Sequence, residues 1–158
     1  MRYFSDEFVR SYHVPLSRNQ IEVVSEAVGI AFPEDYVAFM KTTGGVTFKD
    51  FGLIPINGTP AKPHHVAIII DEILPMKPSS ELASVFWDEW ECIQGRIPAG
   101  FFPIALDGFG NRILMSASGQ CVFWDHEVDD GEQEPSILMT IASSFSQFLN
   151  LLRPVPND

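Results

Sequence analysis

The stretch at residues 101–126 reads FFPIALDGFGNRILMSASGQCVFWDH. Two turn-forming runs, DGFGN at 107–111 and SASG at 116–119, divide it into three short apolar segments. These segments are rich in residues that suit a pleated, half-buried surface. The stretch therefore predicts three strands that form an antiparallel meander, and the other elements are expected to pack around it.

The two later segments of this stretch alternate in character. One side contains Ile113, Met115, Cys121 and Phe123. The other side contains Arg112, Leu114, Ser116, Val122 and Trp124. Because successive side chains of a strand point to opposite faces, one set is expected to face a core and the other a second layer or solvent.

Helices are predicted before and after the meander. Ser17 and Gln20 form a capping-box pattern that starts one helix, and Gly29 ends it. Pro33 suits the first position of a second helix, which the glycine pair at 44–45 ends. The other predicted elements are a short helix within residues 1–16, one or two strands within 46–56, a strand over 66–74, a helix over 81–94, a strand over 137–140 and a helix from Ser143 or Ser144 to Leu152.

Charge limits the class of partner. The 158 residues include 21 acidic and 10 basic side chains, which gives a formal net charge of −11. A field of this sign repels nucleic acid and anionic membranes and attracts a basic protein, although many acidic proteins use their charge only for solubility.

The sequence also indicates a compartment. No apolar run is long enough to span a bilayer, and the first ten residues, MRYFSDEFVR, do not resemble a secretory leader. Cys92 and Cys121 are far apart and have no CxxC spacing, which favours two buried thiols in a reducing compartment over a disulfide. We therefore expect a cytoplasmic protein with one domain over residues 1–158.

Two regions are candidates for binding a partner. In the predicted helix at 81–94, Trp87 lies at the edge of the apolar stripe, where it either packs on the sheet or anchors a partner. The loop at 125–134 holds six carboxylates and no Lys or Arg, so it must be solvated or partnered. The predicted partner-binding residues are Trp87, Asp88, Glu91, Asp125, Glu127, Asp129, Asp130, Glu132 and Glu134.

Motifs for catalysis or metal binding do not match. The acidic loop has part of a calcium-loop spacing, but its glycine, Gly131, comes one residue late and Ser136 stands where the closing glutamate belongs. There is no GxSxG element, and neither cysteine has a neighbouring histidine. The sequence predicts no catalytic residue, no metal and no cofactor; a catalytic set assembled by the fold is the alternative.

Four stretches of the sequence together form a recognisable pattern: FPEDY at 32–36 with Phe39 and the glycines at 44–45, IALDG at 104–108 with Gly110 and Asn111, GQCVFWDHE at 119–127, and IASSF at 141–145 with Phe148 and Leu149. Together they resemble the SUKH superfamily, the cell-wall-regulator-like group that includes many bacterial immunity proteins. Their order and spacing are similar to the family's from about residue 17 to 152.

The resemblance implies a single α+β domain in which a curved, mainly antiparallel sheet packs against N-terminal and C-terminal helices. It also implies a non-catalytic protein-binding role. Many members neutralise a cognate polymorphic toxin, often a nuclease, by binding its toxin domain, and others regulate cytoplasmic processes through protein contacts. An immunity protein with a basic toxin domain as its partner is therefore the first hypothesis, and a regulatory adaptor with a non-toxin partner is the alternative.

Overall fold

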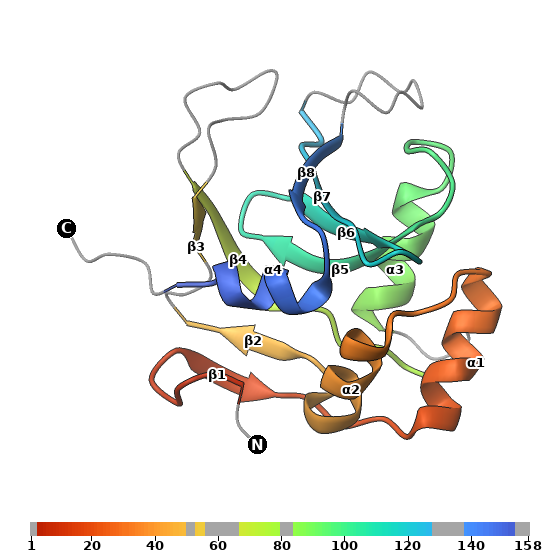
Figure 1. Cartoon of the computed structure of the whole chain (residues 1–158), viewed down its shortest axis with the longest axis horizontal. Helices are drawn as coiled ribbons and strands as arrows, with labels where there is room; N and C mark the ends of the chain where they lie inside the picture. The colour runs from red at the N-terminus through yellow and green to blue at the C-terminus, as the bar shows by residue number, and fades with distance from the viewer. Residues whose placement is uncertain (1–2, 50–52, 56–66, 80–83, 128–137, 154–158) are drawn as a thin grey trace.

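The computed structural model describes residues 3–49, 53–55, 67–79, 84–127 and 138–153. Its strands are β1 (Val9–Tyr12), β2 (Val46–Phe48), β3 (Leu53–Pro55), β4 (Ala67–Ile73), β5 (Phe101–Asp107), β6 (Arg112–Ser116), β7 (Cys121–Trp124) and β8 (Leu138–Ala142). They form a sheet in the order β1-β2-β4-β5-β6-β7-β8, and β3 pairs with β4 beside this path. Each described pair of strands is antiparallel, and the sheet is open (Figure 1).

The meander predicted at residues 101–126 is confirmed as β5, β6 and β7. Phe102 lies opposite Met115 in the first pair, and Ile113 lies opposite Phe123 in the second. The alternation along β6 and β7 separates two apolar clusters. The main core contains Ile113, Met115, Cys121 and Phe123 from these strands. The second cluster consists of Leu114, Val122 and Trp124 with Ile93 and Ile97.

Four helices lie among the described residues: α1 (Arg18–Val28), α2 (Glu34–Thr43), α3 (Val85–Ile93) and α4 (Phe145–Leu151). The capping box is confirmed, because Ser17 Oγ accepts from the N–H of Gln20 and the Gln20 side chain accepts from the N–H of Ser17. Gly29 ends α1 with φ of 73° and Gly44 ends α2 with φ of 67°, as predicted. Pro33 is the N-cap residue of α2 and not its first helical residue, so the helix begins at Glu34, one residue later than predicted.

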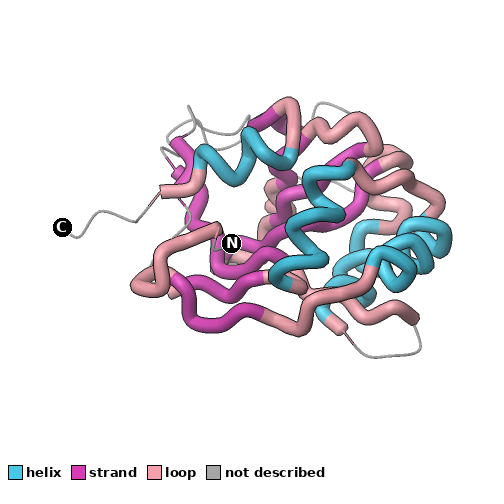
Figure 2. The backbone as a smooth tube through the Cα atoms, turned by 60° about the horizontal axis from the view of Figure 1, so that its bottom comes forward, coloured by secondary structure: helices cyan, strands magenta, loops and turns pink. Residues whose placement is uncertain are grey.

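The helices cover both sides of the meander (Figures 1 and 2). On one side, α2 and α4 meet in an aromatic core, where the ring of Phe145 lies 5.1 Å from Tyr36 and 5.2 Å from Phe39. On the other side, the second half of α3 covers Trp124, which is fully buried. The fold is therefore the predicted single-domain α+β arrangement of a sheet against N-terminal and C-terminal helices.

The prediction of a short helix within residues 1–16 is wrong. Residues 9–12 form the edge strand β1, in which Val9 lies opposite Phe48 and Ser11 lies opposite Thr47. Upstream, the rings of Phe4 and Phe48 pack edge to face at 5.0 Å. Pairing with a distant strand thus overrides a weak local helical spacing.

No helix in the described part of the chain combines the length and the apolar character that a membrane span requires.

Candidate functional site

The two tryptophans of α3 lie in different environments. Trp87 is only 6% exposed, and its Nε1–H donates to the carbonyl oxygen of Lys77 at 2.9 Å. Its ring also packs edge to face on Phe86. The segment after β4 therefore covers Trp87, and the structure corrects the prediction that this side chain anchors a partner. Trp90, three residues later, is half-buried.

The three carboxylates of α3 divide into two groups. Asp88 and Glu91 are exposed, so their charge is accessible to a partner. Glu89 instead faces the sheet and forms an ion pair with Arg112 of β6, in which the two side chains are 17% and 12% exposed. Because Glu89 is engaged within the fold, α3 offers two of its three acids to the solvent.

The acidic loop begins inside the fold. Asp125 is 2% exposed, and its Oδ1 accepts from the N–H of Glu127 at 3.0 Å. Asp125 thus shapes the turn after β7, which corrects the prediction that it presents charge at the surface. Glu127 is exposed. The other predicted acids of this loop lie outside the described residues: Asp129, Asp130, Glu132 and Glu134.

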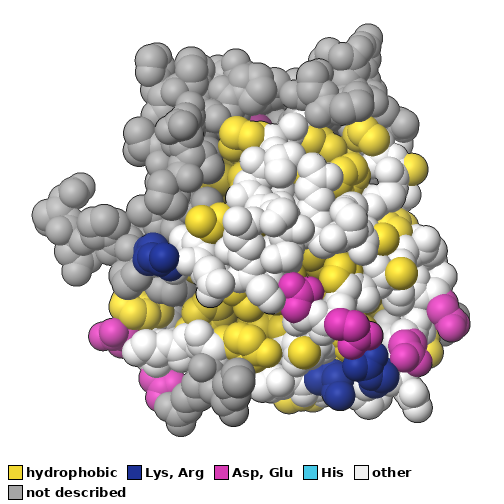
Figure 3. All heavy atoms as spheres, in the orientation of Figure 1, with side chains coloured by type: hydrophobic (Ala, Val, Ile, Leu, Met, Phe, Trp, Pro, Cys, Tyr) yellow, Lys and Arg dark blue, Asp and Glu magenta, His cyan; other side chains and the backbone are white. Residues whose placement is uncertain are grey.

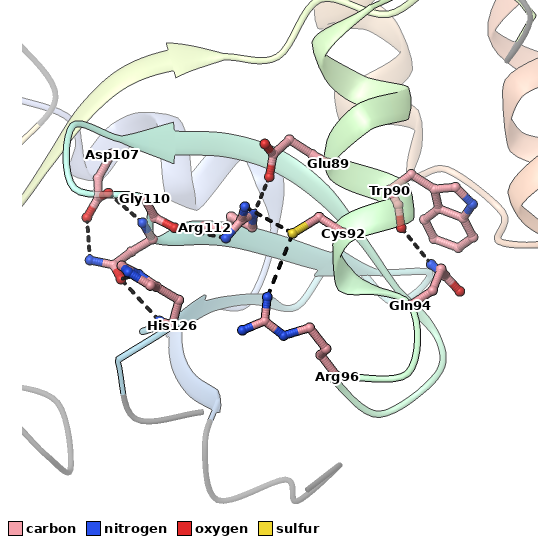
Figure 4. Close-up of polar contacts among 10 residues, drawn as sticks. Glu89, Trp90, Cys92, Gln94, Arg96, Asp107, Gly110, Arg112 and His126 are labelled. Carbon is pink, nitrogen blue, oxygen red and sulfur yellow. Dashed lines mark hydrogen bonds and ion pairs between the residues drawn. The ribbon is translucent and has the colours of Figure 1, made fainter. Parts of the chain in front are cut away.

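A buried polar network holds this turn against the β5–β6 turn. The Asp107 carboxylate accepts from the backbone N–H groups of Phe109 and Asn111 at 2.9 and 2.7 Å, and from Asn111 Nδ2 at 2.8 Å. Asn111 Oδ1 accepts from the backbone N–H of His126, and it lies 2.8 Å from His126 Nδ1 (Figure 4). Since an amide oxygen only accepts, Nδ1 carries the proton. The DGFGN motif, predicted only as a turn, therefore also positions His126.

A second network that the sequence analysis missed centres on Arg112. Its guanidinium pairs with Glu89, donates to the carbonyl oxygen of Gly110 at 2.8 Å, and donates to Cys92 Sγ at 3.3 Å (Figure 4). The guanidinium also lies 5.1 Å from the ring centroid of Trp124, and that of Arg96 lies 4.8 Å from the same ring. The signal in the sequence was a lone cation within the apolar meander. These contacts hold α3 against the sheet, and both guanidinium groups lie over the buried ring of Trp124.

The structure separates the two cysteines by reactivity. Cys121 is fully buried, and burial raises the pKa of its thiol to about 12, whereas Cys92 is half-buried. At pH 8, roughly one in ten thousand Cys121 thiols is ionised, and only the thiolate reacts with alkylating reagents.

Iodoacetamide should therefore label the folded protein at Cys92 alone, as read by intact mass and peptide mapping. Cys92→Ser should abolish labelling until urea unfolds the chain; equal labelling of both thiols in the folded protein would contradict this assignment.

The described histidines, cysteines and carboxylates are not arranged to hold a metal ion: none of their groupings reaches three members. A hollow of about 510 Å³ lies beside His13, between the segments 13–16 and 75–78 and the start of α3. His13 Nε2 is engaged with Thr47 Oγ1 at 3.0 Å and with Glu72 Oε1 at 3.3 Å. Ser84, also in its wall, uses its hydroxyl to accept from the N–H of Trp87. The polar groups here support the fold.

Comparison with known families gives a match over most of the chain. The model of the SMI1 / KNR4 family (SUKH-1) matches residues 15–151. This span includes the described helices and strands from α1 to α4, and all four stretches that carry the resemblance in the sequence. No curated protein sequence matches the chain significantly.

Proposed function

This chain belongs to the SMI1 / KNR4 family (SUKH-1), and from this membership we propose that it is a non-catalytic immunity protein. It neutralises a cognate polymorphic toxin, often a nuclease in this superfamily, by binding the toxin domain. The family match over residues 15–151 is the observation that carries the proposal. A regulatory protein with a non-toxin partner is the second candidate, because the same membership includes such proteins.

The electrostatics support a basic partner. The chain carries a formal net charge of −11, and Asp88, Glu91 and Glu127 are exposed. Figure 3 shows further acidic side chains along the α1 and α2 side of the molecule, with Lys and Arg side chains beside some of them. A negative field speeds the encounter with a positively charged toxin domain and repels nucleic acid. We propose that these three acids, with Asp129, Asp130, Glu132 and Glu134, face the partner.

The use of the polar side chains supports a binding role without chemistry. Asp107, Asn111 and Asp125 are buried and receive hydrogen bonds from within the fold. Arg112 is engaged by Glu89. The free thiols of Cys92 and Cys121 fit a reducing compartment, and we place the protein in the bacterial cytoplasm. No cofactor enters the proposal.

The direct test is protection from a toxin. A large toxin gene beside this one is expected, and expression of the chain should restore growth to cells that express the isolated toxin domain. The purified proteins should form a complex whose association slows with salt, because screening weakens the attraction between opposite charges. A stable complex with a non-toxin protein, without any protection, would replace immunity with the regulatory candidate.

A charge-reversal variant tests the role of the described acids. Replacing the three described acids of the proposed surface, as Asp88→Lys, Glu91→Lys and Glu127→Lys, should slow association about tenfold at low salt and flatten its salt dependence. Stopped-flow or surface-based kinetics at several salt concentrations would measure both effects. Unchanged kinetics would remove these three side chains from the binding surface.

A further inference from the structure

A hollow of about 340 Å³ opens between the end of α1 and the end of α3. Its wall consists of Trp90 and the segments 28–30, 93–95 and 97–101. Ile30, Ile93 and Ile97 are 8%, 1% and 5% exposed, so the buried part of this wall is aliphatic. Pockets for small ligands start near this volume, and the hollow suits one large side chain better than a cofactor.

The aromatic part of this wall is preformed. Trp90 packs against both apolar clusters, and its carbonyl oxygen accepts from Gln94 Nε2 at 2.9 Å. Phe101, at the start of β5, packs against the second cluster and is half-buried. Because neighbours on two sides hold Trp90, its remaining exposed surface offers a rigid contact at little cost in conformational entropy.

The charged side chains of this region are acidic on the solvent side. Glu22 and Glu26 of α1 and Glu91 of α3 are exposed. Figure 4 shows Trp90 and Gln94 on the side of α3 opposite to the two arginines of the Trp124 network. The two helices whose ends border the hollow therefore carry exposed carboxylates.

Arg18, the cation of α1, lies near Glu22 and pairs with Glu34. Arg18 stands at the far end of α1 and donates two hydrogen bonds to Glu34, at 3.0 and 2.9 Å. Ten residues of helix separate Arg18 from Val28 in the wall, a distance of about 15 Å. Charge complementarity thus favours a positively charged occupant.

We propose that this hollow is an anchor site that receives one large apolar side chain, of the size of Leu, Met or Phe, from a partner segment with Lys or Arg on either side. The aliphatic and aromatic wall takes the side chain out of water, and the acids of α1 and α3 receive the flanking cations. Anchors of this kind, an apolar group in a pocket within a polar rim, dominate the energetics of many interfaces. The inference rests on the proposed protein-binding function and names the surface that performs it.

A plug variant tests the pocket without disturbing the core. Ala99 lines the hollow and is itself exposed, so Ala99→Trp should fill the pocket with little effect on stability. The probe is the short peptide Lys-Lys-Gly-Phe-Gly-Lys-Lys, titrated into the ¹⁵N-labelled full chain. It should shift the signals of Gly95 and of the Trp90 indole N–H. Ala99→Trp should abolish these shifts, and the same peptide with Gly in place of Phe should not produce them.

Two charge variants separate local from overall electrostatics. Glu26→Lys with Glu91→Lys should weaken binding of the Phe peptide about tenfold at low salt. The control, Asp6→Lys with Glu7→Lys, changes the net charge equally but lies before β1, a segment away from α1 and α3 in Figure 1. It should leave most of the affinity intact. Equal losses in the two variants, or peptide shifts that persist in Ala99→Trp, would overturn the anchor site.

The cognate partner distinguishes this inference from the proposed function. Ala99→Trp should weaken a toxin complex by about thirtyfold or more, which is the effect of losing a central anchor. Undiminished binding by a variant with the melting temperature of the original protein would overturn the anchor site and leave the immunity role standing. If no protein partner exists, the proposed function fails, and absence of the peptide shifts would overturn the pocket independently.

Discussion

Replacing Gly44 with alanine should lower the free energy of unfolding by about 3 to 5 kcal/mol, among the largest losses expected from one substitution in this chain. Gly44 has φ of 67°, and a Cβ there would lie 2.0 Å from the carbonyl oxygen of Val14. The left-handed conformation alone costs an alanine roughly 1 kcal/mol or more. The clash adds to this cost, because it involves backbone that the Leu16 N–H ties to α2 through Met40. Urea titration would measure the loss.

Gly29→Ala is the matched control for this substitution. Gly29 also ends a helix with φ of 73°, but nothing in the described structure lies within 4 Å of a Cβ built there. Its replacement should cost only about 1 kcal/mol, the price of the backbone conformation without the clash. Equal losses at Gly29 and Gly44 would mean that the segment at Val14 does not press on the end of α2 as the structure shows.

The parts of the fold that local chemistry determines could be predicted from the sequence. The capping box of Ser17 and Gln20 involves residues three apart, and the alternation in β6 and β7 depends on neighbouring side chains. Both predictions are confirmed. The prediction for the N-terminal segment was wrong because β1 finds its backbone hydrogen-bond partners in β2, more than thirty residues later. Nothing within residues 1–16 encodes that pairing.

The candidate site was harder to predict, because helical periodicity shows which residues share a face but not what covers that face. The sequence allowed Trp87 to anchor a partner. In the structure, the segment of Lys77 covers the indole, whose N–H donates to the Lys77 carbonyl oxygen. Trp90, one turn later, keeps part of its ring exposed at the end of α3. Asp125 was assigned to a solvated run of charge, yet its carboxylate accepts a backbone hydrogen bond from within the fold. For Trp87, a segment before the helix decides exposure, whereas the Asp125 carboxylate turns back to the N–H of Glu127, two residues later.

Arg112→Ala should destabilise the protein by about 3 to 5 kcal/mol, because it leaves the largely buried carboxylate of Glu89 without its cation. The substitution also removes the donor to the Gly110 carbonyl and the guanidinium over the Trp124 ring. α3 should loosen from the sheet as a result. Urea unfolding would give the loss in free energy, and hydrogen exchange in α3 would show where the structure opens.

Removing both charges together separates the ion pair from simple loss of packing. The double variant Arg112→Met with Glu89→Met keeps apolar volume between α3 and β6 and leaves neither charge unpaired in this largely buried position. Replacing a buried pair by apolar side chains is often nearly neutral, so the double variant should lose no more than about 1 kcal/mol. It should therefore be more stable than Arg112→Ala despite carrying one more substitution. The reverse order of stabilities would show that the guanidinium acts through its contacts with Gly110, Cys92 and Trp124, and not by neutralising Glu89.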